Sequence, residues 1–175
     1  MISRFVSGIA GAAMVLAATT AWAQQTSDNQ VAAKTDWSVF EDSDPRECWA
    51  VSSPKETVNT KDGRVVAVRR SDILLMAFYR PGAGVSGQVT FTGGYPFAKG
   101  SSVSLKIDDN SFDLFAEGEW AWPASPSDDA KIITAMKRGK SAILTAHSSR
   151  GTKTQDTFSL LGFTAAVEEA EKRCQ

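Results

Sequence analysis

The C-terminal stretch of the sequence, residues 151–174, constrains the fold more than any other part of the chain. It predicts a strand, a break at Gly162 and a short helix that ends on Cys174. Polar and apolar positions alternate in the strand, which is typical of a half-buried β-strand. The face expected to lie inward carries Thr154, Asp156, Phe158 and Leu160. An apolar stripe with helical spacing follows, through Phe163, Val167, Ala170 and Cys174. Cys174 is therefore expected to point inward.

The N-terminal segment, residues 1–23, has the features of a signal peptide. Arg4 supplies the positive charge, an apolar and small-residue run follows, and an A-x-A pattern ends at Ala23, after which cleavage is expected. The alternative is a membrane anchor, but the run is short and rich in Gly, Ala and Thr. The sequence therefore predicts a periplasmic or secreted protein, with no transmembrane segment after cleavage.

The remainder of the chain is expected to form one domain. Residues 24–35 are polar and aperiodic and predict a flexible lead-in, and residues 36–175 are long enough for a single β-rich domain with its own core. The chain carries 19 Lys and Arg against 20 Asp and Glu, a net charge of −1. It has no basic excess to hold a nucleic-acid backbone, so no nucleic-acid partner is expected.

The two cysteines of the chain, Cys48 and Cys174, are expected to form one disulfide, because disulfides persist in the compartments that signal peptides lead to. Two free thiols in a redox site are the alternative, but the sequence has no CxxC pair.

The pattern of short alternating segments predicts a mainly β fold. About nine strands with turn residues between them, and two short helices, favour an antiparallel β-sandwich or flattened barrel. The two helices are expected near residues 127–138 and at the C-terminus, where the last helix is tethered by the disulfide. Residues 54–63 are expected to be a polar loop.

Two tryptophans, Trp120 and Trp122, are separated by one residue and would share a face of an extended chain. Such indoles can stack on a sugar or a peptide, so they mark a possible ligand or partner surface. The alternative is a lid over the hydrophobic core.

Few residues of the chain are suited to catalysis. One combination is His147 with Ser148 or Ser149 and Asp156, since a nucleophilic serine needs a base and a group that orients the base. Neither serine lies on a GxSxG elbow. The single histidine and the paired cysteines leave no metal site, and no cofactor is expected. The inventory favours a protein that is not an enzyme.

Three charged residues have alternative roles. Asp156 shares a face with Phe158 and Leu160, so if it is buried it needs donors such as backbone N–H groups, Lys or Arg. Arg69 and Arg70 are either a ligand-facing pair or a solvated turn.

Motifs at both ends of this domain resemble a known family. The motif at the start of the domain consists of Trp37, Val39, Cys48, Trp49 and Val51. The domain closes on Gly151, Thr152, Asp156, Phe158, Ser159, Leu160, Gly162, Phe163 and Ala166, before the helix and its cysteine. Together these residues resemble the invasion-associated locus B family of alphaproteobacterial envelope proteins. The resemblance implies a secreted or periplasmic β-rich domain, with relatives in some pathogens associated with entry into host cells. The resemblance implies no catalytic residues and no cofactor.

The sequence thus favours a non-enzymatic envelope protein that binds an unidentified envelope protein or surface ligand. A structural subunit of an envelope complex is the alternative. A hydrolase using His147, Ser149 and Asp156 is a third hypothesis.

Overall fold

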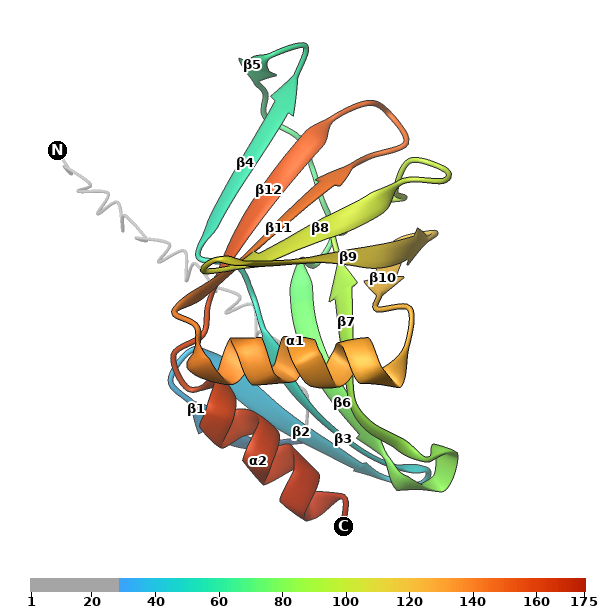
Figure 1. Ribbon diagram of the computed structural model, residues 1–175, viewed down its shortest axis with the longest axis vertical. Helices are drawn as coiled ribbons and strands as arrows, with labels where there is room; N and C mark the ends of the chain where they lie inside the picture. Colours follow the sequence, from blue (N-terminus) through green and yellow to red (C-terminus); the bar gives the residue numbers. More distant parts are fainter. Residues whose placement is uncertain (1–28) are drawn as a thin grey trace, which may run out of the picture.

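The computed structural model describes residues 29–175, which contain one antiparallel β-sheet and two α-helices (Figure 1). The predicted signal peptide lies outside the described residues. The strands of the N-terminal half are β1 (Gln30–Lys34), β2 (Trp37–Ser43), β3 (Arg46–Ser52), β4 (Glu56–Lys61), β5 (Arg64–Val65), β6 (Leu74–Arg80) and β7 (Val85–Thr92). The later elements are β8 (Ser102–Ile107), β9 (Asn110–Glu117), β10 (Trp120–Trp122), α1 (Pro126–Arg138), β11 (Ser141–His147), β12 (Lys153–Ser159) and α2 (Phe163–Arg173).

The twelve strands form one continuous sheet in the order β1-β2-β3-β6-β7-β10-β9-β8-β11-β12-β4-β5. The sheet does not close, because β1 and β5 end this order and do not pair with each other. It twists strongly, so that β4, β12, β11 and β8 fan out above β1, β2, β3, β6 and β7 (Figure 1). The prediction of a mainly β, antiparallel fold with two short helices is confirmed.

The hydrophobic core lies on the inner side of this curved sheet. The strand pattern places it there: on β8, Val103, Leu105 and Ile107 are fully buried while the residues between them are exposed. Both helices cover the lower half of the sheet, with α2 against β2 and β3 and α1 against β7 (Figure 1). Asp129 fixes α1 in place, since its carboxylate accepts a hydrogen bond of 2.7 Å from the backbone N–H of Val89.

The C-terminal stretch folds as its sequence predicts. Asp156 and Phe158 on β12 are fully buried, and the apolar stripe of α2 packs inward. At the start of α2 the Phe163 ring meets Trp37 of β2 edge to face, with ring centroids 4.8 Å apart. At its end, Cys174 is joined to Cys48 of β3 across a sequence separation of 126 residues. The predicted tether of the C-terminal helix is confirmed.

Gly162 is required where β12 gives way to α2. Its φ of 90° lies in the left-handed region, which L side chains rarely adopt. A Cβ atom there would lie 1.8 Å from the carbonyl oxygen of Lys34, in the connection between β1 and β2. The glycine therefore permits both the turn of the chain and the close approach of the N-terminal strands.

Two segments differ from the sequence expectation. Residues 30–34, within the expected lead-in, form β1 and pair with β2, and residues 56–61, within the expected loop, form β4 and pair with β12. Neither strand has a fully buried side chain. Edge and outer strands of this kind are held by backbone hydrogen bonds, so they lack the alternation that reveals a half-buried strand.

Candidate functional site: an aromatic sheet face and a basic pocket

The outer side of the sheet, away from the core, changes character between its two halves. Because side chains alternate across a strand, each inward residue leaves an outward neighbour. On β8, β11 and β12 these neighbours are mostly polar, as in Ser104, Thr145 and Gln155. On β2, β3, β6, β9 and β10 they include an aromatic set, which we call the aromatic face. The aromatic face consists of Phe40, Trp49, Phe78, Phe115, Trp120 and Trp122.

Three rings of the aromatic face form a ladder across neighbouring strands. Phe40 is the register partner of Trp49, and Trp49 is the partner of Phe78. The ring centroids are 5.5 Å apart in the first pair and 6.0 Å in the second, and both pairs are stacked. The guanidinium of Arg80 lies 4.4 Å from the centre of the Phe78 ring and ends the ladder, while it pairs with Glu47 at 3.1 Å. The ladder is therefore bordered by charges that already neutralise each other.

The two predicted tryptophans lie on the same outer side. Ala121 between them points into the core and is fully buried, so Trp120 and Trp122 point away from it. Trp120 is 45% exposed, and Phe115, which packs edge to face on Trp122, is 56% exposed. A hollow of about 340 Å³ separates Trp120 and Trp122 from Phe78. The indoles therefore lie on the outer side of the sheet, opposite the core.

The buried acid predicted on β12 has a partner from a distant part of the chain. Arg70, in the segment before β6, binds both carboxylate oxygens of Asp156 at 2.8 and 2.6 Å. The side chains are 5% and 0% exposed. Thr57 donates a further hydrogen bond of 3.0 Å to the same carboxylate. The sequence predicted that a buried Asp156 needs donors but did not identify Arg70, whose side chain is buried and does not lie in a solvated turn.

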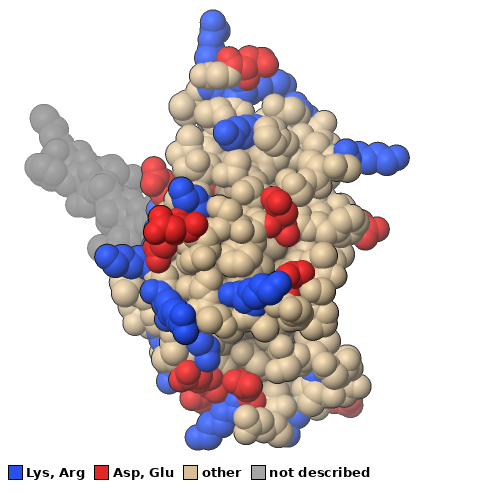
Figure 2. Space-filling model, in the orientation of Figure 1, with Lys and Arg blue, Asp and Glu red and all other residues tan. Residues whose placement is uncertain are grey.

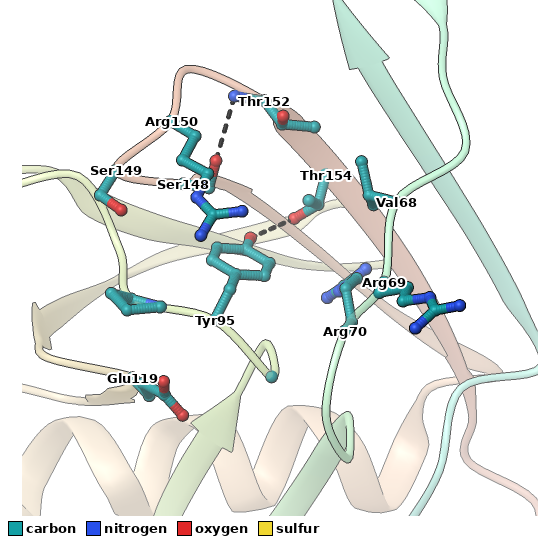
Figure 3. A pocket seen from close by; sticks show the side chains of 12 residues that line it. Val68, Arg69, Arg70, Tyr95, Glu119, Ser148, Ser149, Arg150, Thr152 and Thr154 are labelled. Atoms are coloured by element: carbon teal, nitrogen blue, oxygen red, sulfur yellow. Dashed lines mark hydrogen bonds between the residues drawn. The ribbon is translucent and has the colours of Figure 1, made fainter.

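A pocket of about 400 Å³ lies beside this ion pair (Figure 3). The Arg70 guanidinium lies 4.9 Å from the centre of the Tyr95 ring, and the Tyr95 hydroxyl is hydrogen bonded to that of Thr154. Burial raises the pKa of Tyr95, so its hydroxyl stays protonated. Arg69 and Arg150 lie on the rim. The structure thus forms a basic pocket from residues that the sequence did not bring together.

The three residues of the hydrolase hypothesis are not assembled. His147 is exposed at the end of β11, where its register partner is Lys153. Asp156 pairs with Leu144 and points to the inner side, where Arg70 and Thr57 hold its carboxylate. His147 and Asp156 therefore lie on opposite sides of the sheet, and Asp156 does not orient His147 toward Ser149. Within residues 29–175, no group of three His, Cys, Asp or Glu side chains is placed to hold a metal.

The residues of the closing sequence motif have structural positions. Gly151 and Gly162 have φ angles of 78° and 90°. Most of the other members are buried in β12, in α2 or at their ends: Thr152, Asp156, Phe158, Leu160, Phe163 and Ala166. Ser159, which is half-buried, accepts a hydrogen bond of 3.0 Å at its carbonyl from the Trp37 indole. The motif therefore describes how the chain end is fixed.

Neither the helices nor the charge pattern adds another site. In the part of the chain that the structure describes, no helix is long and apolar enough to cross a membrane. On the side that carries the helices, basic and acidic side chains are interspersed (Figure 2).

Comparison with known proteins gives two matches. The family model described as "Invasion associated locus B (IalB) protein" matches residues 22–171. The crystal structure of invasion associated protein B from Bartonella henselae is similar with a TM-score of 0.52 at 15% identity, over 79% of this chain and 94% of that chain. At this identity the likeness concerns the fold alone. A search of curated proteins gave no match. Because the family model spans most of the chain, the protein belongs to the invasion associated locus B family.

Proposed function

We propose that this protein is a non-enzymatic binding module of the bacterial envelope, and that its aromatic face holds an apolar surface of another envelope protein. The observation that carries the proposal is the aromatic face itself. Six aromatic side chains from five strands share one side of the sheet; Phe115 and Trp120 are exposed and the other four are half-buried. An exposed aromatic patch of this extent is typical of an interaction surface.

The chemistry of the face favours a protein over a sugar. Tryptophan and phenylalanine are enriched in the centres of protein interfaces, and charged residues are depleted there. The charges that border the ladder, Arg80 and Glu47, are paired with each other. Hollows of about 340 and 750 Å³ along the face can receive apolar side chains. The larger hollow is lined by apolar side chains such as Val51, Leu74 and Met76, and by charged residues that include the paired Lys55 and Asp36.

Two features support an envelope location. The predicted signal peptide ends at Ala23, the chain carries a disulfide, and disulfides persist mainly in oxidising compartments. The association with host-cell entry belongs to family members in some pathogens, and we do not extend it to this protein.

Site-specific photo-crosslinking in living cells tests the proposal. A photoreactive amino acid replaces Phe115, once in the wild-type background and once with Trp122→Ala, and a control replaces Gln155 on the polar half. One recurrent protein adduct is expected at Phe115, with a yield that falls by about tenfold with Trp122→Ala, because interface aromatics carry much of the binding energy. No such adduct is expected at Gln155. Adducts with glycans, equal yields in both backgrounds, or no adduct at Phe115 would each contradict the proposal.

A structural subunit of an envelope complex is the second candidate, supported by the same aromatic face. A structural subunit and a binding module differ in the stoichiometry with which they are recovered with their partner. A subunit co-purifies with its partner in a constant ratio after detergent extraction, whereas a binding module exchanges and is lost on dilution.

A further inference from the structure

We propose that the basic pocket beside Tyr95 binds a sugar-sized ligand that carries a carboxylate, of the chemical class of the hexuronates. This binding site is separate from the aromatic face and does not depend on the proposed function.

The pocket is built from segments far apart in the sequence, and hydrogen bonds hold them together. Its walls are residues 68–70, the 94–96 loop and the 148–154 turn with the start of β12 (Figure 3). Ser71 donates its backbone N–H to Gly94 at 3.0 Å, and Ser149 donates to Pro96 at 2.9 Å. The pocket therefore exists before any ligand arrives, as most small-molecule sites do.

The charges around the pocket leave a positive excess. Asp156 neutralises Arg70, which acts as a fixed part of the floor. Arg69 and Arg150 are exposed on the rim, and within residues 29–175 neither forms an ion pair. Glu119 is the one acidic residue of the lining. The Arg150 guanidinium points toward Tyr95, whereas that of Arg69 points away from it (Figure 3). The Arg150 group attracts an oxyanion, and the planar fork of arginine fits a carboxylate.

Hydroxyl groups supply further donors at the bottom of the pocket. Tyr95 and Thr154 share one hydrogen bond, so one of their two hydroxyl hydrogens remains for a ligand. The hydroxyl oxygen of Ser148 accepts a hydrogen bond of 3.1 Å from the backbone of Thr152, which leaves its own hydrogen free to donate. These groups suit a ligand with several hydroxyls, and the Tyr95 ring provides a surface for a sugar ring.

The backbone of the 148–152 turn favours a carboxylate over a phosphate. Phosphate sites commonly use a row of free backbone N–H groups. Here the N–H groups of Ser148, Ser149, Gly151 and Thr152 all donate to partners within the protein. These four N–H groups are occupied, so side chains supply most of the donors for the anion, and the volume of about 400 Å³ accommodates one sugar unit.

Calorimetric titration of the full chain with glucuronate, glucose 6-phosphate and glucose tests the proposal. Glucuronate is expected to bind about tenfold more tightly than glucose, because a charge-assisted hydrogen bond adds about that factor. It is also expected to bind more tightly than glucose 6-phosphate, and more weakly as salt is added. Absence of glucuronate binding, or equal binding of glucose, would overturn the proposal. Tighter binding of the phosphate would overturn the choice of a carboxylate.

Three variants at exposed positions locate the site without disturbing the fold. Arg150→Gln is expected to weaken glucuronate binding by about tenfold. Glu119→Gln is expected to strengthen it, because a like charge is removed. Arg64→Gln, at an exposed arginine of β5 outside the pocket, serves as the matched control and should change nothing. Unchanged binding in Arg150→Gln would place the ligand elsewhere and overturn the proposal. Trp122→Ala separates the two proposals, since it should leave glucuronate binding intact.

Discussion

At the scale of single residues, Asp156 and Arg70 determine how the two halves of the molecule meet. Asp156 comes from β12 in the upper part of the sheet, and Arg70 precedes β6 in the lower part. Arg70 also donates a hydrogen bond of 2.7 Å to the carbonyl of Gly93. Because both charges are removed from water, each depends on the other for its stability.

Removing one partner is expected to cost far more than removing both. Arg70→Met leaves the buried carboxylate unpaired and should lower the free energy of unfolding by about 3–5 kcal/mol. The double variant Arg70→Met/Asp156→Leu should lose less than the sum of the single variants. Urea unfolding of the four proteins measures this, with Arg64→Met as an exposed control that changes stability by less than about 0.5 kcal/mol. Additive losses would show that the two side chains act independently.

The sequence predicts one side of this pair but not the other. An acid on the apolar face of a strand demands a donor, and that inference needs only the alternation of β12. Its partner lies 86 residues away, next to Asp72 and another arginine, where local reasoning favours a solvated turn. Arg70 could not be predicted because long-range pairing leaves no local pattern.

At the scale of elements, the start of α2 is fixed by the space that Gly162 leaves for the β1–β2 connection. Gly162→Ala adds a methyl group that collides with Lys34, and it should lower stability by at least about 2 kcal/mol more than Gly151→Ala. Gly151 is the matched control, because its φ of 78° is similar but nothing lies near its added Cβ. Thermal unfolding of both variants measures the difference. Equal losses would mean that only backbone strain matters at Gly162.

The end of α2 is fixed by the disulfide. Cys48→Ser and Cys174→Ser are each expected to lower the free energy of unfolding by about 2–5 kcal/mol. The double variant should lose no more than either single variant, because both changes break the same bond. Denaturant unfolding without reductant tests this, and an additive loss in the double variant would mean that each cysteine has a separate role.

Whether a strand could be predicted depended on its side-chain burial. β8, β12 and the paired strands β2 and β3 bury one face and were recognisable from alternation. β1 and β4 bury no complete face, and they extend the sheet through backbone pairing that the sequence does not record.

At the scale of the whole molecule, one curved sheet forms a core on its inner side and two different surfaces on its outer side. The tryptophan pair was visible in the sequence as a possible surface. The ladder of Phe40, Trp49 and Phe78 was not, because its rings come from three strands and their alignment depends on register. Likewise, the pocket beside Tyr95 depends on the curvature that brings the 94–96 loop near the 148–154 segment.

The separation of Cys48 and Cys174 in the sequence also limits when their disulfide can form during synthesis of the chain. A polypeptide is made from its N-terminus, so the first thiol emerges 126 residues before the second, a delay on the order of ten seconds at ordinary synthesis rates. Throughout that interval Cys48 has no intrachain partner, since the chain contains only these two cysteines. The bond can form only after the residues of β12 and α2, which precede Cys174, have been synthesised. It therefore cannot guide any folding step that takes place before the C-terminal end of the chain has been synthesised.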